Sequence, residues 1–141
     1  MEGKEIFSRA LEWLDNYTDF AVVGATTDPE KYGFKYIQAY AQAGYRVTPV
    51  NPKYQQILGI PCKASLKEVS PPPQVVIAIV SPRISVKVAQ ECASLGLKRL
   101  WLPPETWNDE ILAYCQGRGL EVVHDICPLM ALKYFTRDKG E

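Results

Sequence analysis

Residues 20–29 read Phe20-Ala21-Val22-Val23-Gly24-Ala25-Thr26-Thr27-Asp28-Pro29, an apolar run that ends in a turn of small residues. Such a run predicts a buried strand that turns into a helix, and open α/β sheets bind nucleotide phosphates at this kind of turn. The dinucleotide-binding motif has further glycines two and five residues after the first, where this chain has Thr26 and Pro29. The stretch therefore predicts a phosphate-binding turn that is not of the usual dinucleotide type.

Length and charge exclude several classes of protein. The 141 residues suffice for one domain with a single core, so we expect residues 1–141 to form one domain. The 16 basic and 16 acidic residues balance, which argues against partners such as nucleic acid or a membrane surface. Charges interrupt the apolar residues of 1–17, so we expect no signal peptide, no spanning segment and a cytoplasmic location. The sequence leaves a homo-oligomer open.

Four cysteines, at positions 62, 92, 115 and 127, are widely spaced and form no C-x-x-C pair. Zinc clusters and disulfide frameworks show closer or paired spacings. We therefore expect free thiols and no metal site.

Apolar runs alternate with helical patterns along most of the chain. Residues 1–17 are expected to form a lead-in helix, and further helices are expected near residues 33–43, 83–95 and 107–117. Strands are expected near residues 19–24, 45–50, 74–80, 98–102 and 120–124. This alternation predicts an α/β fold with a doubly wound sheet of about five mainly parallel strands and helices on both faces.

Two smaller features complete the predicted organisation. In the loop between the second and third strands, Ser65 and Glu68 are expected to cap a short helix. Residues 136–141 are expected to be a frayed tail.

Ligands of a doubly wound sheet bind beyond the carboxyl ends of its strands, so the residues after each strand form one candidate site. After the first strand, Gly24 permits a sharp turn, and the hydroxyls of Thr26 and Thr27 with helix NH groups suit a diphosphate. Lys31 would add positive charge. The alternative is that any parallel sheet needs a small residue at this turn.

The second strand ends in Asn51-Pro52-Lys53, where an NAD site usually has an acidic residue for the ribose hydroxyls. Lys53 would instead attract a phosphate on that ribose. The alternative is an ordinary solvated lysine in a loop.

The third and fourth strands end in proline-containing loops. Ser81-Pro82 suits either a ligand contact or plain capping of the next helix. Pro103-Pro104 stiffens its loop, which suits the wall of an adenine pocket or simply a rigid turn. Trp101 and Trp107 are interpreted as core aromatics rather than stacking platforms.

Cys127 follows the last strand on the ligand side of the sheet, and Pro128 marks a helix start. The positive end of a helix favours the thiolate of such a cysteine, although a buried inert cysteine fits the sequence as well. The single histidine, His124, has no partner at the spacing of a catalytic set and is interpreted as structural. No catalytic residue is assigned.

Several motifs combine in this chain: Val-Val-Gly-Ala-Thr at 22–26, Pro29-Glu30-Lys31, Gly-Tyr-x-Val-x-Pro-Val-Asn-Pro-Lys at 44–53, Leu58-Gly59, Ser65-Leu66, and Asp125 with Cys127. Together they resemble the stand-alone bacterial and archaeal CoA-binding proteins. Those proteins are similar to the N-terminal CoA-binding domain of the succinyl-CoA synthetase alpha subunit. The stretch 44–53 is the most specific part of the resemblance.

The resemblance implies a Rossmann-like fold with CoA as the cofactor. The turn from Gly24 to Thr27 would take the CoA diphosphate, and Lys53 would lie near the phosphorylated ribose. Val80-Ser81-Pro82 and Pro103-Pro104-Glu105 would line the path of the adenine and the pantetheine arm. The pantetheine thiol would then reach Cys127, where we hypothesise a reversible mixed disulfide.

The chain also departs from the family pattern. The family usually has a basic residue between the aspartate and the cysteine, and acid and histidine residues soon after. This chain has Ile126 and Pro128-Leu129-Met130 there. We expect no activity that depends on those groups, and no ligase chemistry, because the synthetase's phosphohistidine domain has no counterpart in these residues.

The sequence thus predicts a protein that binds CoA or acyl-CoA without catalytic activity of its own, as a sensor or carrier. Two alternatives stay open. One is a small nucleotide-dependent oxidoreductase or acyl-CoA enzyme that uses Cys127 or His124. The other is an interaction subunit with a degenerate nucleotide pocket.

Overall fold

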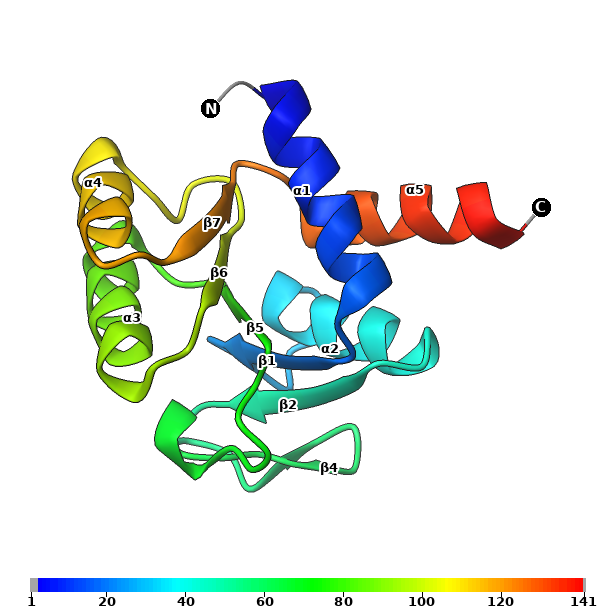
Figure 1. Ribbon diagram of the computed structural model, residues 1–141. Coiled ribbons are helices and arrows are strands. Elements are labelled where there is room, and N and C mark those ends of the chain that lie inside the picture. Colours follow the sequence, from blue (N-terminus) through cyan, green and yellow to red (C-terminus); the bar gives the residue numbers. More distant parts are fainter. Residues whose placement is uncertain (1–2, 141) are drawn as a thin grey trace.

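A five-stranded parallel sheet lies between two layers of helices in the computed structural model, which describes residues 3–140 (Figure 1). The strand order is β2-β1-β5-β6-β7. The strands are β1 (Asp19–Val23), β2 (Arg46–Val50), β5 (Val75–Ala78), β6 (Arg99–Leu102) and β7 (Glu121–His124), all paired in parallel. The doubly wound, Rossmann-like α/β fold predicted from the sequence is confirmed.

Helices cover both faces of this sheet. One face carries α1 (Gly3–Asn16), α2 (Tyr32–Gln42) and α5 (Pro128–Gly140), and the other carries α3 (Pro82–Leu95) and α4 (Asp109–Gly117), as Figure 1 shows. Successive strand residues point to opposite faces. In β1, Phe20 and Val22 therefore join the core under α1, α2 and α5, whereas Ala21 joins the core under α3 and α4.

The winding of the chain reverses between β1 and β5. The chain passes from β1 through α2 to β2 on one side, and β5 then returns to the other side of β1. The backbone NH of Gly24 donates to the carbonyl of Val50, and the backbone NH of Ile79 donates to the carbonyl of Val23. Hydrogen bonding between the chain segments therefore continues past the strand ends. In open α/β sheets, ligands bind at such a switch point, beyond the carboxyl ends of the strands.

The loop between β2 and β5 contains a small hairpin that the sequence analysis did not predict, formed by β3 (Gln56–Ile57) and β4 (Ile60–Pro61). Its strands have two residues each, too few for a recognisable alternation of polar and apolar residues. A single turn of 3-10 helix follows at Leu66–Glu68, where the short helix was expected. The expected cap is wrong for Ser65, because its side chain makes no capping hydrogen bond and its hydroxyl is buried without a partner.

The C-terminal helix is longer than the sequence indicated. The frayed tail predicted for 136–141 is helical as far as Gly140, and Glu141 lies outside the described residues. Phe135 packs against the core beneath α1 and α2, which gives the helix a reason to continue past its first turns. None of the helices within residues 3–140 is long and apolar enough to cross a membrane.

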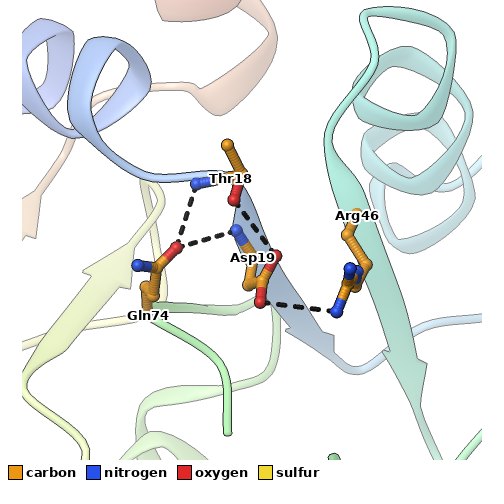
Figure 2. Close-up of polar contacts among 4 residues, drawn as sticks. All are labelled: Thr18, Asp19, Arg46 and Gln74. Atoms are coloured by element: carbon orange, nitrogen blue, oxygen red, sulfur yellow. Dashed lines mark hydrogen bonds and ion pairs between the residues drawn. The ribbon is translucent and has the colours of Figure 1, made fainter. Parts of the chain in front are cut away.

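A polar cluster fixes the strand register at the amino ends of the strands, at the opposite end of the sheet from the switch point (Figure 2). The side-chain oxygen of Gln74 accepts hydrogen bonds from the NH groups of Thr18 and Asp19, at 3.0 and 3.1 Å. The NH of Gln74 in turn bonds the carbonyl of Asp19 at 2.8 Å. Arg46 on β2 lies 3.8 Å from the Asp19 carboxylate. Gln74 therefore ties β1 to the entry of β5.

Replacing Gln74 with Ala removes the acceptor for two backbone NH groups. We expect Gln74→Ala to lower the free energy of unfolding by about 1–2 kcal/mol. Gln90→Ala on the exposed face of α3 is the matched control, with an expected change near zero. Denaturant unfolding followed by circular dichroism measures both. Equal effects of the two substitutions would contradict the role given to Gln74.

Candidate functional site

The turn after β1 is built around Gly24, whose φ angle is +92°. A Cβ at this position would collide with the carbonyl oxygen of Ile79 and lie 2.9 Å from the Val80 side chain. Glycine is therefore required here both for its backbone conformation and for the close passage of the residues that follow β5.

The start of α2 packs directly on this turn. Gly33 is the second residue of α2, and a Cβ there would collide with the carbonyl oxygen of Gly24. The NH groups of the first helical turn, including those of Tyr32 and Gly33, have no preceding helical carbonyl to bond, which makes a helix N-terminus favourable for anions. Gly33 thus permits the close packing that the last glycine of the dinucleotide motif provides.

Asn51 connects the turn to the loop after β2. Its side-chain nitrogen donates to the carbonyl of Ala25 at 2.9 Å, and its side-chain oxygen accepts from the NH of Lys53 at 2.9 Å. Asn51 is therefore a positioning residue that holds the Lys53 loop against the turn.

Thr26 and Tyr54 line a first hollow beside this turn. Their hydroxyls are 3.2 Å apart and share a hydrogen bond, and Thr26 also accepts from the NH of Asp28. The contact with Thr26 lowers the pKa of Tyr54. The Lys53 ammonium lies 5.8 Å from the Tyr54 ring centroid. This hollow has a volume of about 530 Å³ and is lined by Gly24, Ala25, Thr26, Glu30, Lys31, Tyr32, Gly33, Asn51, Lys53, Tyr54 and Ile79.

A second hollow of about 490 Å³ adjoins the first, and Tyr32 and Ile79 border both. The rings of Tyr32 and Tyr36, one helical turn apart on α2, stack with centroids 5.6 Å apart. The second hollow is lined by Tyr32, Tyr36, Ile79, Val80, Ser81, Pro104, Glu105, Thr106 and Cys127. The two hollows together form an elongated cleft at the switch point of the sheet.

The segment that carries Cys127 is held in place on both sides. The indole NH of Trp101 donates to the carbonyl of Ile126 at 2.9 Å, and the Tyr40 hydroxyl donates to the carbonyl of Pro128 at 3.0 Å. The Cys127 carbonyl accepts from the NH of Ala131 at the start of α5. The thiol is partly exposed and lies beside the hydroxyl of Tyr36.

The structure brings most of the predicted site residues to this cleft. The first hollow includes Gly24, Ala25, Thr26, Lys31, Asn51 and Lys53, and the second includes Val80, Ser81, Pro104, Glu105 and Cys127. Four predicted residues do not line either hollow: Thr27 and Pro52 are exposed beside the first, Pro82 begins α3, and Pro103 is buried beneath its loop. Ser81 is the residue before α3, but its side chain makes no capping hydrogen bond.

Sequence reasoning missed several lining residues. Tyr32 and Tyr36 carry a detectable signal, since two aromatics one turn apart follow a predicted phosphate turn. Gly33 was missed because the loop between Gly24 and α2 is longer than in the dinucleotide-binding motif, so Gly33 lies outside the spacing of that motif. Tyr54 and Thr106 have no signal in the sequence, because their positions depend on hydrogen bonds to Thr26 and to the Pro103 carbonyl.

His124 lies away from this cleft. Its ring packs against Trp107 at a centroid distance of 4.4 Å, and it borders a separate hollow between α1, α4 and β7. Burial lowers the pKa of His124. Trp101 is fully buried, as predicted for a core aromatic. His124 and Cys127 thus face different hollows.

These features define a class: a Rossmann-like domain with an elongated ligand cleft at its topological switch point. The chain belongs to the CoA binding domain family, whose model matches residues 18–133. The resemblance to CoA-binding proteins found in the sequence is therefore confirmed. Membership of this family supports CoA binding.

Small single-domain proteins are among the relatives. The uncharacterized protein YneT of Bacillus subtilis is 29% identical over 126 residues, which cover 89% of this chain and 88% of YneT. The solved structure of a hypothetical protein from Pyrococcus horikoshii OT3 has a TM-score of 0.86 and 28% identity, covering 92% of this chain and 91% of that one.

A larger enzyme is also similar. The ADP-forming acetate–CoA ligase of Methanocaldococcus jannaschii is 27% identical over 88 residues, which cover 62% of this chain. This chain spans only 12% of the ligase's length. The similarity therefore concerns one part of that enzyme.

The contact between Gly33 and the turn can be tested by adding one methyl group. We expect Gly33→Ala to lower the free energy of unfolding by about 1–3 kcal/mol, because the added Cβ meets backbone that has no room to move. Gly117→Ala, at the end of α4 with open space around it, is the control and should be neutral or stabilising. Urea denaturation gives both values. A Gly33→Ala protein as stable as the control would refute the proposed tight packing.

Proposed function

We propose that this protein binds CoA or acyl-CoA in the cleft formed by the two hollows, as a binding protein without a catalytic step of its own. The observation that carries the proposal is the pairing of a phosphate turn at the start of α2 with Lys53 after β2, in a member of a CoA-binding family. An acidic residue would suit the unmodified ribose of NAD at the position of Lys53, whereas a lysine suits a ribose phosphate.

The first hollow suits the charged part of CoA. The diphosphate would lie at the Gly24 turn, where the free NH groups of α2 and the positive end of the helix favour an anion. Lys31 and Lys53 both line this hollow and would neutralise phosphate charge. The chain has no net charge, so this attraction is local.

The second hollow suits the pantetheine arm. Tyr32, Val80 and Pro104 give it apolar walls, and its volume lies in the range typical of small-ligand pockets. Cys127 also lines this hollow, so the reactive end of CoA would lie next to a protein thiol. This placement supports a sensor or carrier of CoA groups.

The lining residues support binding rather than turnover. Within the described part of the chain, the second hollow is lined by three titratable types: tyrosine, Glu105 and Cys127. Burial raises the pKa of Tyr36 well above its ordinary value, so it remains a neutral hydroxyl. The histidine needed for a Cys/His pair faces another hollow. We therefore assign no general base to the cleft.

Ligand-induced stabilisation tests the proposed ligand directly. CoA and acetyl-CoA, at about 100 times their Kd, should raise Tm by about 5–10 °C, because a ligand that binds only the native state stabilises it by mass action. NAD, NADP and ATP at the same concentration are the comparison ligands. Thermal unfolding in the presence of a reductant measures the shifts. Stabilisation by NAD without stabilisation by CoA would overturn the proposal.

Charge reversal at Lys53 tests the ribose-phosphate contact. Lys53→Glu should weaken CoA binding about tenfold or more, because a cation near a phosphate becomes an anion. Dephospho-CoA, which lacks the ribose phosphate, should be affected about threefold or less. The matched control is Lys87→Glu on the exposed surface of α3, which should leave both affinities unchanged. Isothermal titration calorimetry measures the affinities, and equal losses for the two ligands would remove this role from Lys53.

A further inference from the structure

The second hollow brings a thiol and a phenol together. Tyr36 is 1% exposed, and its hydroxyl lies beside the thiol of Cys127. Both side chains line the same cavity of about 490 Å³. Cys127 is only partly buried, so its sulfur is reachable from the cavity.

The Tyr36 hydroxyl keeps capacity to bind a further group. A buried tyrosine hydroxyl normally has a good acceptor, and a thiol is a weak one. Burial keeps this hydroxyl protonated by raising the pKa of Tyr36. The hydroxyl can therefore donate to a sulfur anion in the cavity.

The backbone around Cys127 is rigidly held. The carbonyls of Ile126 and Pro128, on either side of it, accept hydrogen bonds from Trp101 and Tyr40. Trp101 and Tyr40 are themselves fully buried. A reactive group on fixed backbone needs little reorganisation to meet a bound partner.

The other three cysteines lack this combination. Burial raises the pKa of Cys92 to about 12 and that of Cys115 to about 11, and both side chains are fully buried. Cys62 is partly exposed, but its thiol lies beside the carbonyl of Asn51 and lines neither hollow of the cleft. Cys127 is therefore the cysteine that a ligand in the cleft would meet.

We propose that Cys127 is a covalent attachment site for CoA, formed by thiol–disulfide exchange with CoA disulfide, and that Tyr36 is the positioning residue of this site. The proposal rests on the proposed function, since it requires the pantetheine arm to occupy the second hollow. It assigns a redox-dependent state to the site: CoA is held reversibly by contacts when thiols are reduced, and covalently when CoA disulfide is present.

The exchange balances without any other reactant. The Cys127 thiol loses its proton, and its sulfur attacks one sulfur of CoA disulfide. The disulfide bond of the reagent breaks and a Cys127–CoA disulfide forms. The second CoA leaves as a thiolate and takes up a proton, so the cysteine is oxidised and one half of the CoA disulfide is reduced. A reducing thiol reverses the reaction by the same route.

Intact mass spectrometry of the wild-type protein tests the attachment. After incubation with CoA disulfide we expect a mass gain of one CoA, removed by dithiothreitol, and peptide mapping should place it on Cys127. Hydroxyethyl disulfide, which has no nucleotide, is the comparison reagent. The CoA adduct should form at least about tenfold faster at equal concentration, because binding in the cleft brings the two sulfurs together.

Variants separate the roles of the residues. Cys127→Ser should form no adduct, whereas Cys62→Ser, which removes a partly exposed thiol outside the cleft, should react as the wild type does. Tyr36→Phe keeps the ring but loses the hydroxyl. At saturating CoA disulfide, its adduct should form roughly tenfold more slowly, while the concentration of CoA disulfide that gives half the maximal rate should not change, because the hydroxyl that would donate to the sulfur anion is gone. Unfolding without ligand verifies that each variant is folded.

The outcomes distinguish this proposal from the proposed function. If CoA raises Tm under reducing conditions but no adduct appears, the attachment is refuted while CoA binding stands. If the adduct persists in Cys127→Ser, or forms equally fast from both disulfides, directed attachment at Cys127 is refuted. If CoA neither stabilises the protein nor forms the adduct, both proposals fail. An unchanged maximal rate of adduct formation in Tyr36→Phe would refute the role of Tyr36.

Discussion

The direct contact between Gly33 and the backbone of Gly24 is the constraint on which the cleft depends. Neither residue has room for a Cβ, so α2 starts against the turn after β1, and the turn lies against the residues after β5. This packing places the N-terminus of α2 at the first hollow. It also places Tyr32, the first residue of the helix, and Tyr36, one turn later, at the second hollow. One close backbone contact thus sets the position of both halves of the cleft.

The amino and carboxyl ends of the parallel strands contribute differently to the structure. At the amino ends, the Gln74 side chain accepts a hydrogen bond from the NH of Asp19, and the NH of Gln74 donates to the carbonyl of Asp19. These bonds fix the register of β1 between β2 and β5. At the carboxyl ends, the loops after the same three strands are held by other contacts, among them the bonds made by Asn51. Because the register is fixed at the amino ends, the loops at the carboxyl ends can diverge to form a cleft without disturbing the pairing of the strands.

Local patterns in the sequence predicted the sheet and its order of elements, because buried parallel strands are continuous apolar runs such as Val75–Ala78. They also predicted residues that follow strand ends, including Lys53 and Cys127, because parallel strands end at one edge. Features that depend on contacts between distant segments were not predictable. Tyr54 reaches the cleft through its bond to Thr26, and the expected Ser65 cap failed because cap geometry depends on how the whole loop packs. The roles of the predicted lining residues remain predictions.

Tyr32 and Ile79 border both hollows, and this shared wall has a consequence for selectivity. In the proposed binding mode, a molecule as short as a nucleoside diphosphate would occupy the first hollow and leave the second to water. A molecule with a long arm would extend past Tyr32 and Ile79, displace that water and lie beside Cys127. The cleft would then select ligands by length in addition to charge.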